Sequence, residues 1–362
     1  MFKLILFLGL IISAGSLEAR EENAWRILLT KVPEQSLVSI GVEQNAIWLA
    51  KSIKALDKKL TIADDNSRIT LYYNGKVIKS WHKPQNINDI ESWTYLIGEL
   101  LDLVLEKSEV AKKHDFEALD LIMNDYVKNL DKDSKYYSDA NDVDKVIHRV
   151  NFAFQEEDGY LWIRLGVFDK NTKEDVIKVI SQYPEIKGLI LDLRASRGGQ
   201  LSVAIEIADL FLEEGIVVSV MGRDEAKVTY FNSKDGDEFE NIPLVILVDA
   251  DTASAAEVLT IALQEQGRAK VIGTKTFGKG TIQSLIHLPN NGILAVSNAN
   301  FYTPSGVKLA EKAIIPDICT FEMPESKDIM RLISLKKDEK CQAESRIDRD
   351  LEVKVAKELL KM

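Results

Sequence analysis

Cysteine and histidine are scarce in this sequence of 362 residues, which contains two cysteines and four histidines. Two cysteines cannot build a disulfide-rich scaffold, and Cys319 and Cys341 are too far apart for a CxxC metal knuckle. The histidines never occur at the spacing typical of metal ligands. We therefore expect neither a metal site nor a cofactor.

Positive charge is also in short supply. The chain has 46 basic and 57 acidic side chains, a net charge of −11, and no block of basic residues. This balance argues against nucleic acid as the main partner. The remaining composition, with 46% hydrophobic and 28% charged residues, is typical of a globular protein.

Long apolar runs are absent except at the start. Lys3 precedes an uncharged, mainly apolar stretch from Leu4 to Ala14, and small residues follow up to Ala19. A membrane span needs about 20 apolar residues, so this stretch predicts a cleaved secretory signal over residues 1–19 rather than an uncleaved anchor. We expect an exported protein, periplasmic or extracellular, that is soluble after signal cleavage.

Residues 20–112 combine helical and strand patterns and predict an α+β region of unknown role. Asn74-Gly75 joins two alternating segments and predicts a hairpin, because both residues accept the positive φ angles of a type I′ turn. Apolar residues at helical spacing predict a helix over Ile90–Glu106. Residues 113–158 read as a helical connector. We find no catalytic pattern in either region.

From Gly159 onwards the pattern becomes α/β. Near-continuous apolar strands alternate with helices, which favours a mainly parallel sheet covered on both faces. The strands are expected at Tyr160–Val167, Gly188–Arg194, Pro243–Asp249 and Ala269–Gly273, with helices at Thr172–Tyr183, Leu201–Glu214 and Ala253–Gln266. This core is expected over residues 159–335, followed by a C-terminal segment and helix over 336–362.

Ser254 lies where the strand ending at Asp249 gives way to a helix. Backbone N–H groups and the positive end of the helix dipole would face an oxyanion formed there, which suits a nucleophile. Taken alone, a serine at this place is more often a helix cap.

Two glycine-containing turns complete the pattern. Lys279 lies between two glycines after an apolar strand, and a lysine can act as a general base only in its neutral form, which burial favours. Gly198-Gly199 follows another buried strand and can present N–H donors to an oxyanion. The alternatives are a surface lysine or phosphate-cradling loop at Lys279 and an ordinary turn at the glycine pair.

Together the three segments resemble the C-terminal processing (tail-specific) serine peptidases, whose motifs are close to LDLRxNPGG, TASASE and TFGKGxVQ. The corresponding stretches are Leu191–Gly199, Thr252–Glu257 and Thr276–Gln283, and the serine precedes the lysine by 25 positions, as in that family. The likeness extends more weakly over residues 116–360. It implies a ClpP/crotonase-like αβ core.

The resemblance also implies roles for single residues. Ser254 would attack the scissile carbonyl, Lys279 would take and return the proton, and Gln283 would hold the lysine amine. The N–H groups of the oxyanion hole would come from Ala255, Gly198 and Gly199.

Two departures from the family pattern stand out. The family usually carries a PDZ domain, but only 22 positions separate Tyr137 from Gly159, and such a domain needs about 80 to 100 residues. We expect no PDZ domain. In addition, Ala195-Ser196-Arg197 stands where the family prefers Gly-Asn-Pro or similar.

The sequence therefore predicts an exported serine endopeptidase that cleaves envelope proteins with a Ser/Lys dyad. Protein or peptide substrates are expected, together with an envelope adaptor or self-association. Alternatives are a catalytically idle relative that binds peptides or acts as a scaffold, and a crotonase-like enzyme acting on acyl-CoA. Export argues against the acyl-CoA enzyme.

Cys319 and Cys341 are expected to form a disulfide, because two lone cysteines in an oxidising compartment are more often bridged than unpaired. Their loop of 22 positions would stabilise the fold by about 3 kcal/mol. The alternative is two unpaired thiols.

Overall fold

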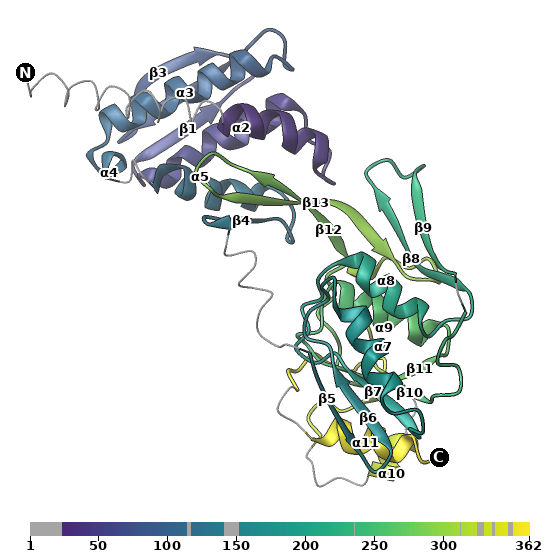
Figure 1. The fold of residues 1–362 in the computed structure, drawn as a ribbon. Helices are drawn as coiled ribbons and strands as arrows, with labels where there is room; N and C mark the ends of the chain where they lie inside the picture. Colours follow the sequence, from purple (N-terminus) through teal and green to yellow (C-terminus); the bar gives the residue numbers. More distant parts are fainter. Residues whose placement is uncertain are drawn as a thin grey trace, which may run out of the picture. The chain divides into compact units, whose positions relative to one another are not determined.

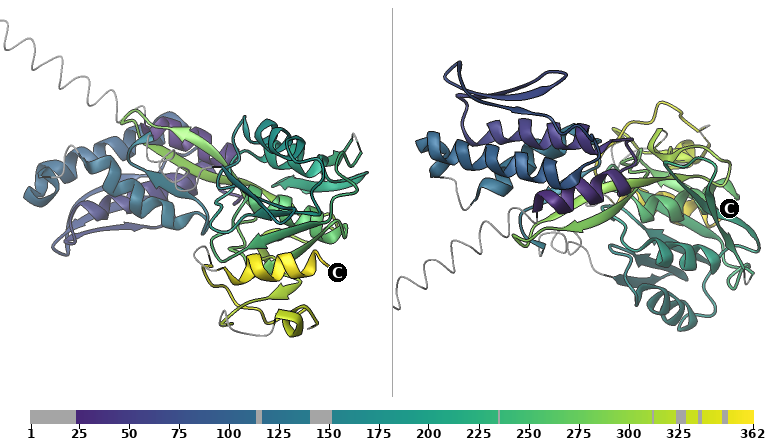
Figure 2. Two further views of the ribbon diagram at one scale, coloured as in Figure 1. Left: turned by 60° about the horizontal axis from the view of Figure 1, so that its bottom comes forward. Right: turned by 90° about the horizontal axis from the view of Figure 1, so that it is seen from above.

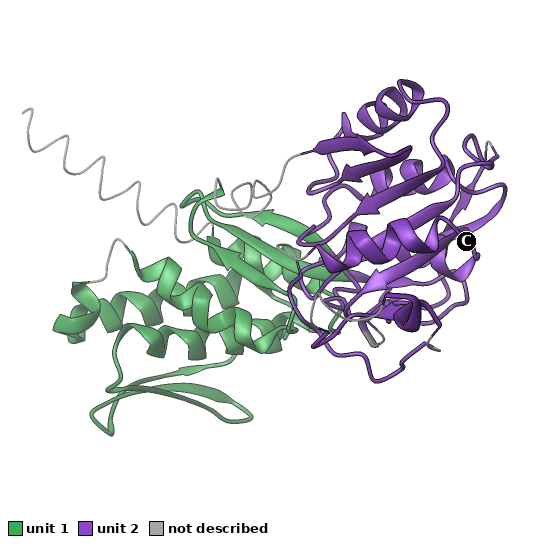
Figure 3. Cartoon of the chain, turned by 90° about the horizontal axis from the view of Figure 1, so that it is seen from below, with its two compact units in different colours: residues 1–143, 283–298 green, residues 144–282, 299–362 purple. Residues whose placement is uncertain are grey.

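The chain folds into two compact units. The computed structural model describes residues 24–113, 117–140, 152–234, 236–311, 313–323, 329–334, 337–346 and 350–362, so the expected signal over residues 1–19 lies outside the described part. Unit 1 comprises residues 1–143 and 283–298, and unit 2 comprises residues 144–282 and 299–362 (Figure 3).

Unit 1 contains an antiparallel sheet of three strands, β1 (Leu60–Asp64), β2 (Arg68–Tyr73) and β3 (Lys76–His82), in that order. The β2–β3 turn is formed by Asn74 and Gly75, whose φ angles are 50° and 73°. The predicted hairpin is therefore confirmed, with the positive φ angles that its turn residues were expected to adopt.

Helices supply most of the core of unit 1. Residues 24–35 are helical, and the other helical elements are α2 (Val42–Ser52), η1 (Ile53–Leu56), α3 (Ile90–Lys107), α4 (Glu109–Lys112), α5 (Ala118–Tyr126) and η3 (Val127–Asn129). Helix α3 matches the expected one and starts at Asp89, whose side chain accepts a hydrogen bond from the Ser92 N–H. Trp25, Trp93 and Tyr126 are fully buried in this core.

The structure divides the chain differently from the expected blocks. Helix α5, expected in a connector over residues 113–158, packs in the core of unit 1. Residues 283–298, expected in the core over 159–335, also belong to unit 1. There the start of β13 (Ile293–Tyr302) pairs with β4 (Lys135–Tyr137). The physical reason is long-range burial of four apolar side chains: Ile286, Leu288, Leu294 and Val296.

Unit 2 is built on a six-stranded sheet, which is parallel except at its β5–β6 edge. Its strands, in spatial order, are β14 (Ile318–Cys319), β11 (Ala269–Gly273), β10 (Leu244–Val248), β7 (Gly188–Asp192), β6 (Tyr160–Arg164) and β5 (Ala153–Glu157). This confirms the mainly parallel α/β core expected from the sequence.

Helices cover both faces of this sheet (Figures 1 and 2). Leu189 and Leu191 of β7 pack with α7 (Thr172–Ser181), α8 (Leu201–Asp209) and α9 (Ala255–Glu265). Between them in sequence, Ile190 points to the other face, where α10 (Ile329–Ser334) and α11 (Leu351–Leu359) lie. Burial on both faces explains the continuous apolar strands.

A smaller antiparallel arrangement completes unit 2. Strand β8 (Gly215–Gly222) pairs with β9 (Val228–Ser233) and with the last residues of β13, Ala299–Tyr302. Strand β12 (Thr281–His287) follows the candidate lysine in sequence and belongs to unit 1 from residue 283 onwards. The short helix η4 (Leu309–Glu311) belongs to unit 2. No described helix has the length and apolar character needed to cross a membrane.

Candidate active site

The three candidate segments follow adjacent parallel strands of unit 2. Residues 193–199, the oxyanion loop, follow β7; residues 249–254, the nucleophile loop, follow β10; and residues 274–280, the base loop, follow β11. Because β7, β10 and β11 are parallel neighbours, their carboxyl ends lie at one edge of the sheet. Ligands of open α/β sheets bind at this edge.

Ser254 occupies a strained turn between β10 and α9. Its φ and ψ angles are 59° and −124°, which is an uncommon conformation for a residue other than glycine. It is the residue before the first turn of α9, and its side chain is half-buried. Ser254 and Glu257 form a capping box at the start of α9, so the placement fits a helix cap as well as a nucleophile, and the nucleophile role stays a prediction.

Gly198 brings the oxyanion loop against the start of α9. A Cβ atom at Gly198 would lie 2.7 Å from the Ala255 nitrogen and 2.7 Å from the Ala253 oxygen, so only glycine allows this approach. The Ala253 N–H donates to the Ser196 oxygen at 2.9 Å. The structure therefore brings together Gly198 and Ala255, two of the three residues expected in an oxyanion hole.

Gly199, the third, is held from the other side. It forms an isolated bridge with Phe168, and its φ is 148°. A Cβ atom at Gly199 would lie 2.4 Å from the Phe168 oxygen. The pair of glycines thus lets the loop pass between Phe168 and helix α9.

Glu257 connects the nucleophile loop to the base loop. Its Oε2 accepts hydrogen bonds from the backbone N–H groups of Ser254 at 3.0 Å and Lys279 at 2.9 Å. Its Oε1 accepts from the Gly278 N–H at 2.7 Å and the Thr276 hydroxyl at 2.5 Å. One fully buried carboxyl group therefore fixes the backbone of both proposed catalytic residues.

The electrostatics of Glu257 reflect these two influences. Burial raises the pKa of Glu257, and the hydrogen bonds from Thr276, Gly278, Ser254 and Lys279 oppose the rise without cancelling it. Sequence analysis gave Glu257 no role. The signal that could have revealed it is the Ser-x-x-Glu spacing from Ser254, because a glutamate at this place can reach back to the N–H of the residue that starts the helix.

Asp249 accepts hydrogen bonds from backbone N–H groups of the oxyanion loop and the nucleophile loop. Sequence analysis gave this residue no role either. Ala195 has a positive φ of 58°, and its N–H donates to Asp249 Oδ1 at 2.9 Å. The same oxygen accepts from the Thr252 N–H at 3.2 Å. Burial raises the pKa of Asp249, and the backbone hydrogen bonds lower it only in part. Alanine is thus held in a conformation that glycine adopts more easily.

Gln283 is not placed in unit 2. It belongs to unit 1, where its Nε2 donates to the carbonyl oxygen of Asp133. Its expected role beside the lysine amine stays a prediction. Within the described residues, no group of three or more histidine, cysteine, aspartate or glutamate side chains is arranged to hold a metal ion. Cys319 and Cys341 form a disulfide with Cα atoms 5.9 Å apart.

Comparison with known proteins assigns a family to the part of the chain that contains the three loops. The model of peptidase family S41 matches residues 159–320, which include the oxyanion, nucleophile and base loops. The chain contains a peptidase S41 domain. The matched residues include five strands of the six-stranded sheet of unit 2, from β6 to β14. Residues 24–140 and the C-terminal helix α11 lie outside the match.

Two curated relatives are C-terminal processing proteases. The carboxy-terminal-processing protease of Bartonella bacilliformis is 39% identical over 178 residues, which are 48% of this chain and 41% of the relative. The carboxyl-terminal-processing protease of Picosynechococcus is 42% identical over 164 residues, or 45% and 39% of the two chains. This chain thus matches only about two-fifths of the length of these relatives.

A longer structural likeness concerns the fold alone. The structure of a lipoprotein from Streptococcus agalactiae covers 82% of this chain and 91% of its own, with a TM-score of 0.54 and 16% sequence identity. The fold of most of this chain therefore occurs in another solved structure.

Proposed function

We propose that this protein is an exported serine endopeptidase that cleaves peptide bonds of envelope proteins with a Ser254–Lys279 dyad. The observation that carries the proposal is the hydrogen-bonded link through Glu257, which ties the backbone of Ser254 to that of Lys279. A serine that only capped a helix would not need this connection to a lysine loop. The S41 match over residues 159–320 supports the same reaction class.

In the proposed reaction, the Ser254 hydroxyl attacks the scissile carbonyl carbon while neutral Lys279 accepts its proton. The oxygen that becomes negative is stabilised by N–H groups of Ala255 and of Gly198 or Gly199. The protonated lysine then gives its proton to the leaving amine, and the acyl-enzyme forms. Lys279 next accepts a proton from a water molecule that attacks the ester carbonyl, and it then returns this proton to the departing Ser254 oxygen. The acid product leaves, and Ser254 is restored.

Mutation of the dyad tests the proposal directly. Purified wild-type protein should hydrolyse casein, whereas Ser254→Ala and Lys279→Ala should lose at least about 10³-fold in kcat, since neither step has a substitute nearby. Lys279→Arg should be equally inactive, because a guanidinium group does not deprotonate near neutral pH.

Matched controls separate chemistry from folding. Ser181→Ala changes an exposed serine at the end of α7, and Lys270→Ala changes an exposed lysine in β11. Both should keep wild-type turnover. If Ser254→Ala hydrolysed casein as fast as the wild type, the dyad would be refuted. If the folded wild type hydrolysed nothing, the protein would be an idle relative instead.

A further inference from the structure

The segment 341–346, here called the C-terminal strap, runs along the loops of the candidate active site. The Lys275 N–H donates to the Gln342 oxygen at 3.1 Å, and the Ala250 N–H donates to the Glu344 oxygen at 3.0 Å. The Thr274 hydroxyl also donates to the Glu344 oxygen, at 2.6 Å. The strap is therefore bonded to the nucleophile loop and the base loop at once, although it lies outside the S41 match.

The end of the strap also reaches the oxyanion loop. The Arg346 N–H donates to Asp249 Oδ2 at 2.9 Å, and the other oxygen of Asp249 accepts from Ala195 at 2.9 Å. The Arg194 guanidinium donates from Nη1 to the Arg346 carbonyl oxygen at 2.9 Å. On the strap side these contacts are made by the backbone N–H and carbonyl groups of Arg346, so a shift of the strap moves the loops.

A buried charged pair anchors this end to helix α11. Glu352 accepts from Arg346 Nε at 2.9 Å through Oε1 and from Arg194 Nη1 at 3.3 Å through Oε2. Arg346, Glu352 and Arg194 are 1%, 0% and 3% exposed. A buried charge without its partner is strongly unfavourable, so each of these groups depends on the others.

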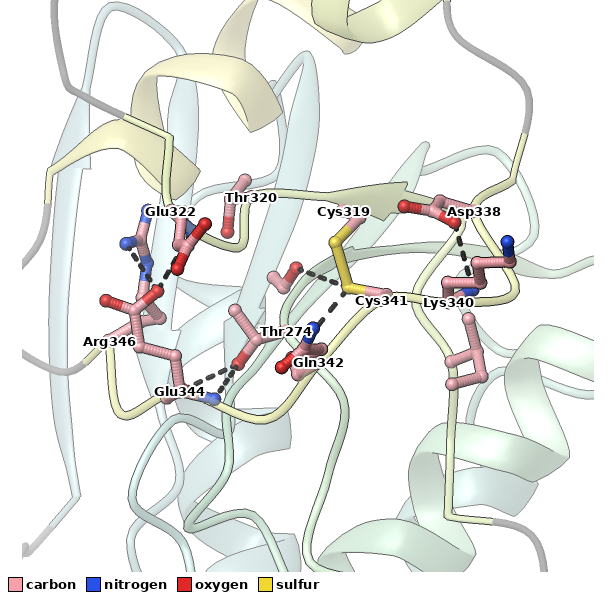
Figure 4. Close-up of a disulfide and its surroundings, with 12 residues drawn as sticks. Thr274, Cys319, Thr320, Glu322, Asp338, Lys340, Cys341, Gln342, Glu344 and Arg346 are labelled. Atoms are coloured by element: carbon pink, nitrogen blue, oxygen red, sulfur yellow. Dashed lines mark hydrogen bonds and ion pairs between the residues drawn. A yellow bond between two sulfur atoms is a disulfide. The ribbon is translucent and has the colours of Figure 1, made fainter.

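The disulfide anchors the other end. Cys341, the first residue of the strap, is bonded to Cys319 at the end of β14 (Figure 4). Next to Cys319, Thr320 donates its hydroxyl to Glu352 Oε1 at 2.6 Å. Both ends of the strap are thus fixed near the end of β14 and helix α11. A covalent bond holds one end, and ion pairs hold the other.

We propose that Arg346 and Glu352 are positioning residues for the catalytic loops, and that the Cys319–Cys341 disulfide keeps the strap seated in its active position. This inference rests on the proposed peptidase function. Catalysis by a preorganised oxyanion hole is sensitive to small displacements, and a shift of about 1 Å costs up to roughly 10²-fold in rate. Without the strap, the three loops would still form, but they would no longer be held in fixed positions relative to one another.

Reduction of the folded wild-type protein tests the disulfide without any mutation. A phosphine reductant breaks the sulfur–sulfur bond, yields two thiols and is itself oxidised to the phosphine oxide with oxygen from water. The two cysteines are the only ones in the chain, and the proposed nucleophile is a serine, so any effect has to act through this bond. We expect kcat to fall about tenfold with KM nearly unchanged, and a Cys319→Ser/Cys341→Ser variant to be equally slow and insensitive to the reductant.

Substitution of the charged pair tests the other anchor. Glu352→Gln should lower kcat by about 10²-fold with KM within about twofold of wild type, and Arg346→Lys, which keeps the positive charge, should retain more activity than Arg346→Met. Lys357→Gln is the matched control. It removes an ion pair between α11 and Glu157 that does not touch the loops, and it should keep wild-type kcat.

Hydrogen exchange gives a readout that does not depend on activity. In Glu352→Gln and in the reduced protein, amides of residues 194–199 and 249–254 should exchange faster, while those of β7 and β10 should not change. Unchanged kcat together with unchanged exchange in both would overturn the proposal. If the wild type proved inactive, the proposed function would fail, and the exchange of these loops would still decide whether the strap positions them. If Glu352→Gln did not fold, the reduction experiment on the wild type would decide alone.

Discussion

The two units differ in what their buried carboxyl groups hold. In unit 2, Glu257 and Asp249 are bonded to the loops of the candidate active site, and burial raises the pKa of both. In unit 1, burial by itself would raise the pKa of Asp57. Hydrogen bonds from Ser108, from the Lys59 N–H and from Tyr73, together with the charge of Lys59, lower this pKa overall. In unit 2, ionisation of Asp249 and Glu257 is made less favourable by burial, and both lie at the proposed site of chemistry. In unit 1, ionisation of Asp57 is favoured, and this carboxylate stabilises the fold.

Glu257→Gln should have the largest effect. It replaces an acceptor oxygen by an amide N–H₂ group among four hydrogen-bond donors, so at least one donor loses its partner. We expect a loss of about 1–3 kcal/mol in the free energy of unfolding. Because both proposed catalytic residues are displaced, kcat should fall by about 10²-fold or more. Steady-state hydrolysis of casein and thermal unfolding measure the two effects.

Asp57→Asn is the matched variant in unit 1. It disturbs the hydrogen bonds with Ser108 and Lys59 and should cost a similar free energy of unfolding, about 1–3 kcal/mol. Turnover per folded molecule should stay at the wild-type level. If Asp57→Asn lowered kcat as strongly as Glu257→Gln, the contrast between the units would be wrong.

Glycine substitutions sharpen the same comparison. Gly198 and Gly75 both have positive φ angles, 82° and 73°. An added Cβ atom would meet backbone atoms at 2.7 Å at Gly198, but nothing within 4 Å at Gly75. Gly198→Ala should therefore push the oxyanion loop away from α9 and lower kcat by about 10²-fold. Gly75→Ala should cost only about 1 kcal/mol of stability and leave kcat unchanged, and equal kcat values for the two variants would contradict this.

These contrasts show why sequence analysis worked better in unit 2 than in unit 1. Strand β10 was predictable because both of its faces are buried and its apolar run is continuous. The turn at Ser254 was predictable because an apolar strand ends at Asp249 and a helical pattern begins soon after it. In both cases the signal lies within about ten consecutive residues.

Features that depend on distant contacts were not predictable. The pairing of Ile293 with Tyr137 joins segments far apart in sequence, and no local pattern in either segment specifies the partner. The same is true of Arg346 and Glu352, which meet Arg194 across 152 and 158 positions. Their charges suggest an exposed surface when the sequence is read locally, since buried charged residues are rare.

Acid should destabilise unit 1 more than unit 2. A lowered carboxyl pKa gives stability above the ordinary pKa of about 4 that is lost as the pH falls through the folded-state value. Hydrogen bonds from Ser134 and Ser297 outweigh burial to lower the pKa of Asp131, and Lys51 lowers that of Asp64, so unit 1 should lose stability below about pH 4. A carboxyl group with a raised pKa has the opposite effect on the pH dependence of stability. Its stability is fully present below the unfolded pKa and is lost as the pH rises through the folded one, so Asp249 and Glu257 do not destabilise unit 2 in acid.

Pepsin digestion between about pH 4 and pH 2 measures this difference, because pepsin is active there and cuts unfolded chains. The Ser254→Ala protein is used to avoid self-cleavage. Mass spectrometry should find the first cuts within residues 24–140. First cuts within residues 152–282 would show that the pKa contrast does not control acid unfolding.

The smallest effect should come from changing the substrate instead of the protein. PDZ-type capture binds the C-terminal carboxylate of a peptide through backbone N–H groups, and the 22 positions between Tyr137 and Gly159 leave no room for such a domain at its usual place in the family. Substrate choice should then depend on the active-site cleft or on unit 1. We expect a peptide with an internal cleavage site to show the same kcat/KM, within about twofold, whether its C-terminus is a carboxylate or an amide. Both peptides carry an acetylated N-terminus, so that only the C-terminal charge differs. A loss of orders of magnitude on amidation would mean that the carboxylate is recognised after all.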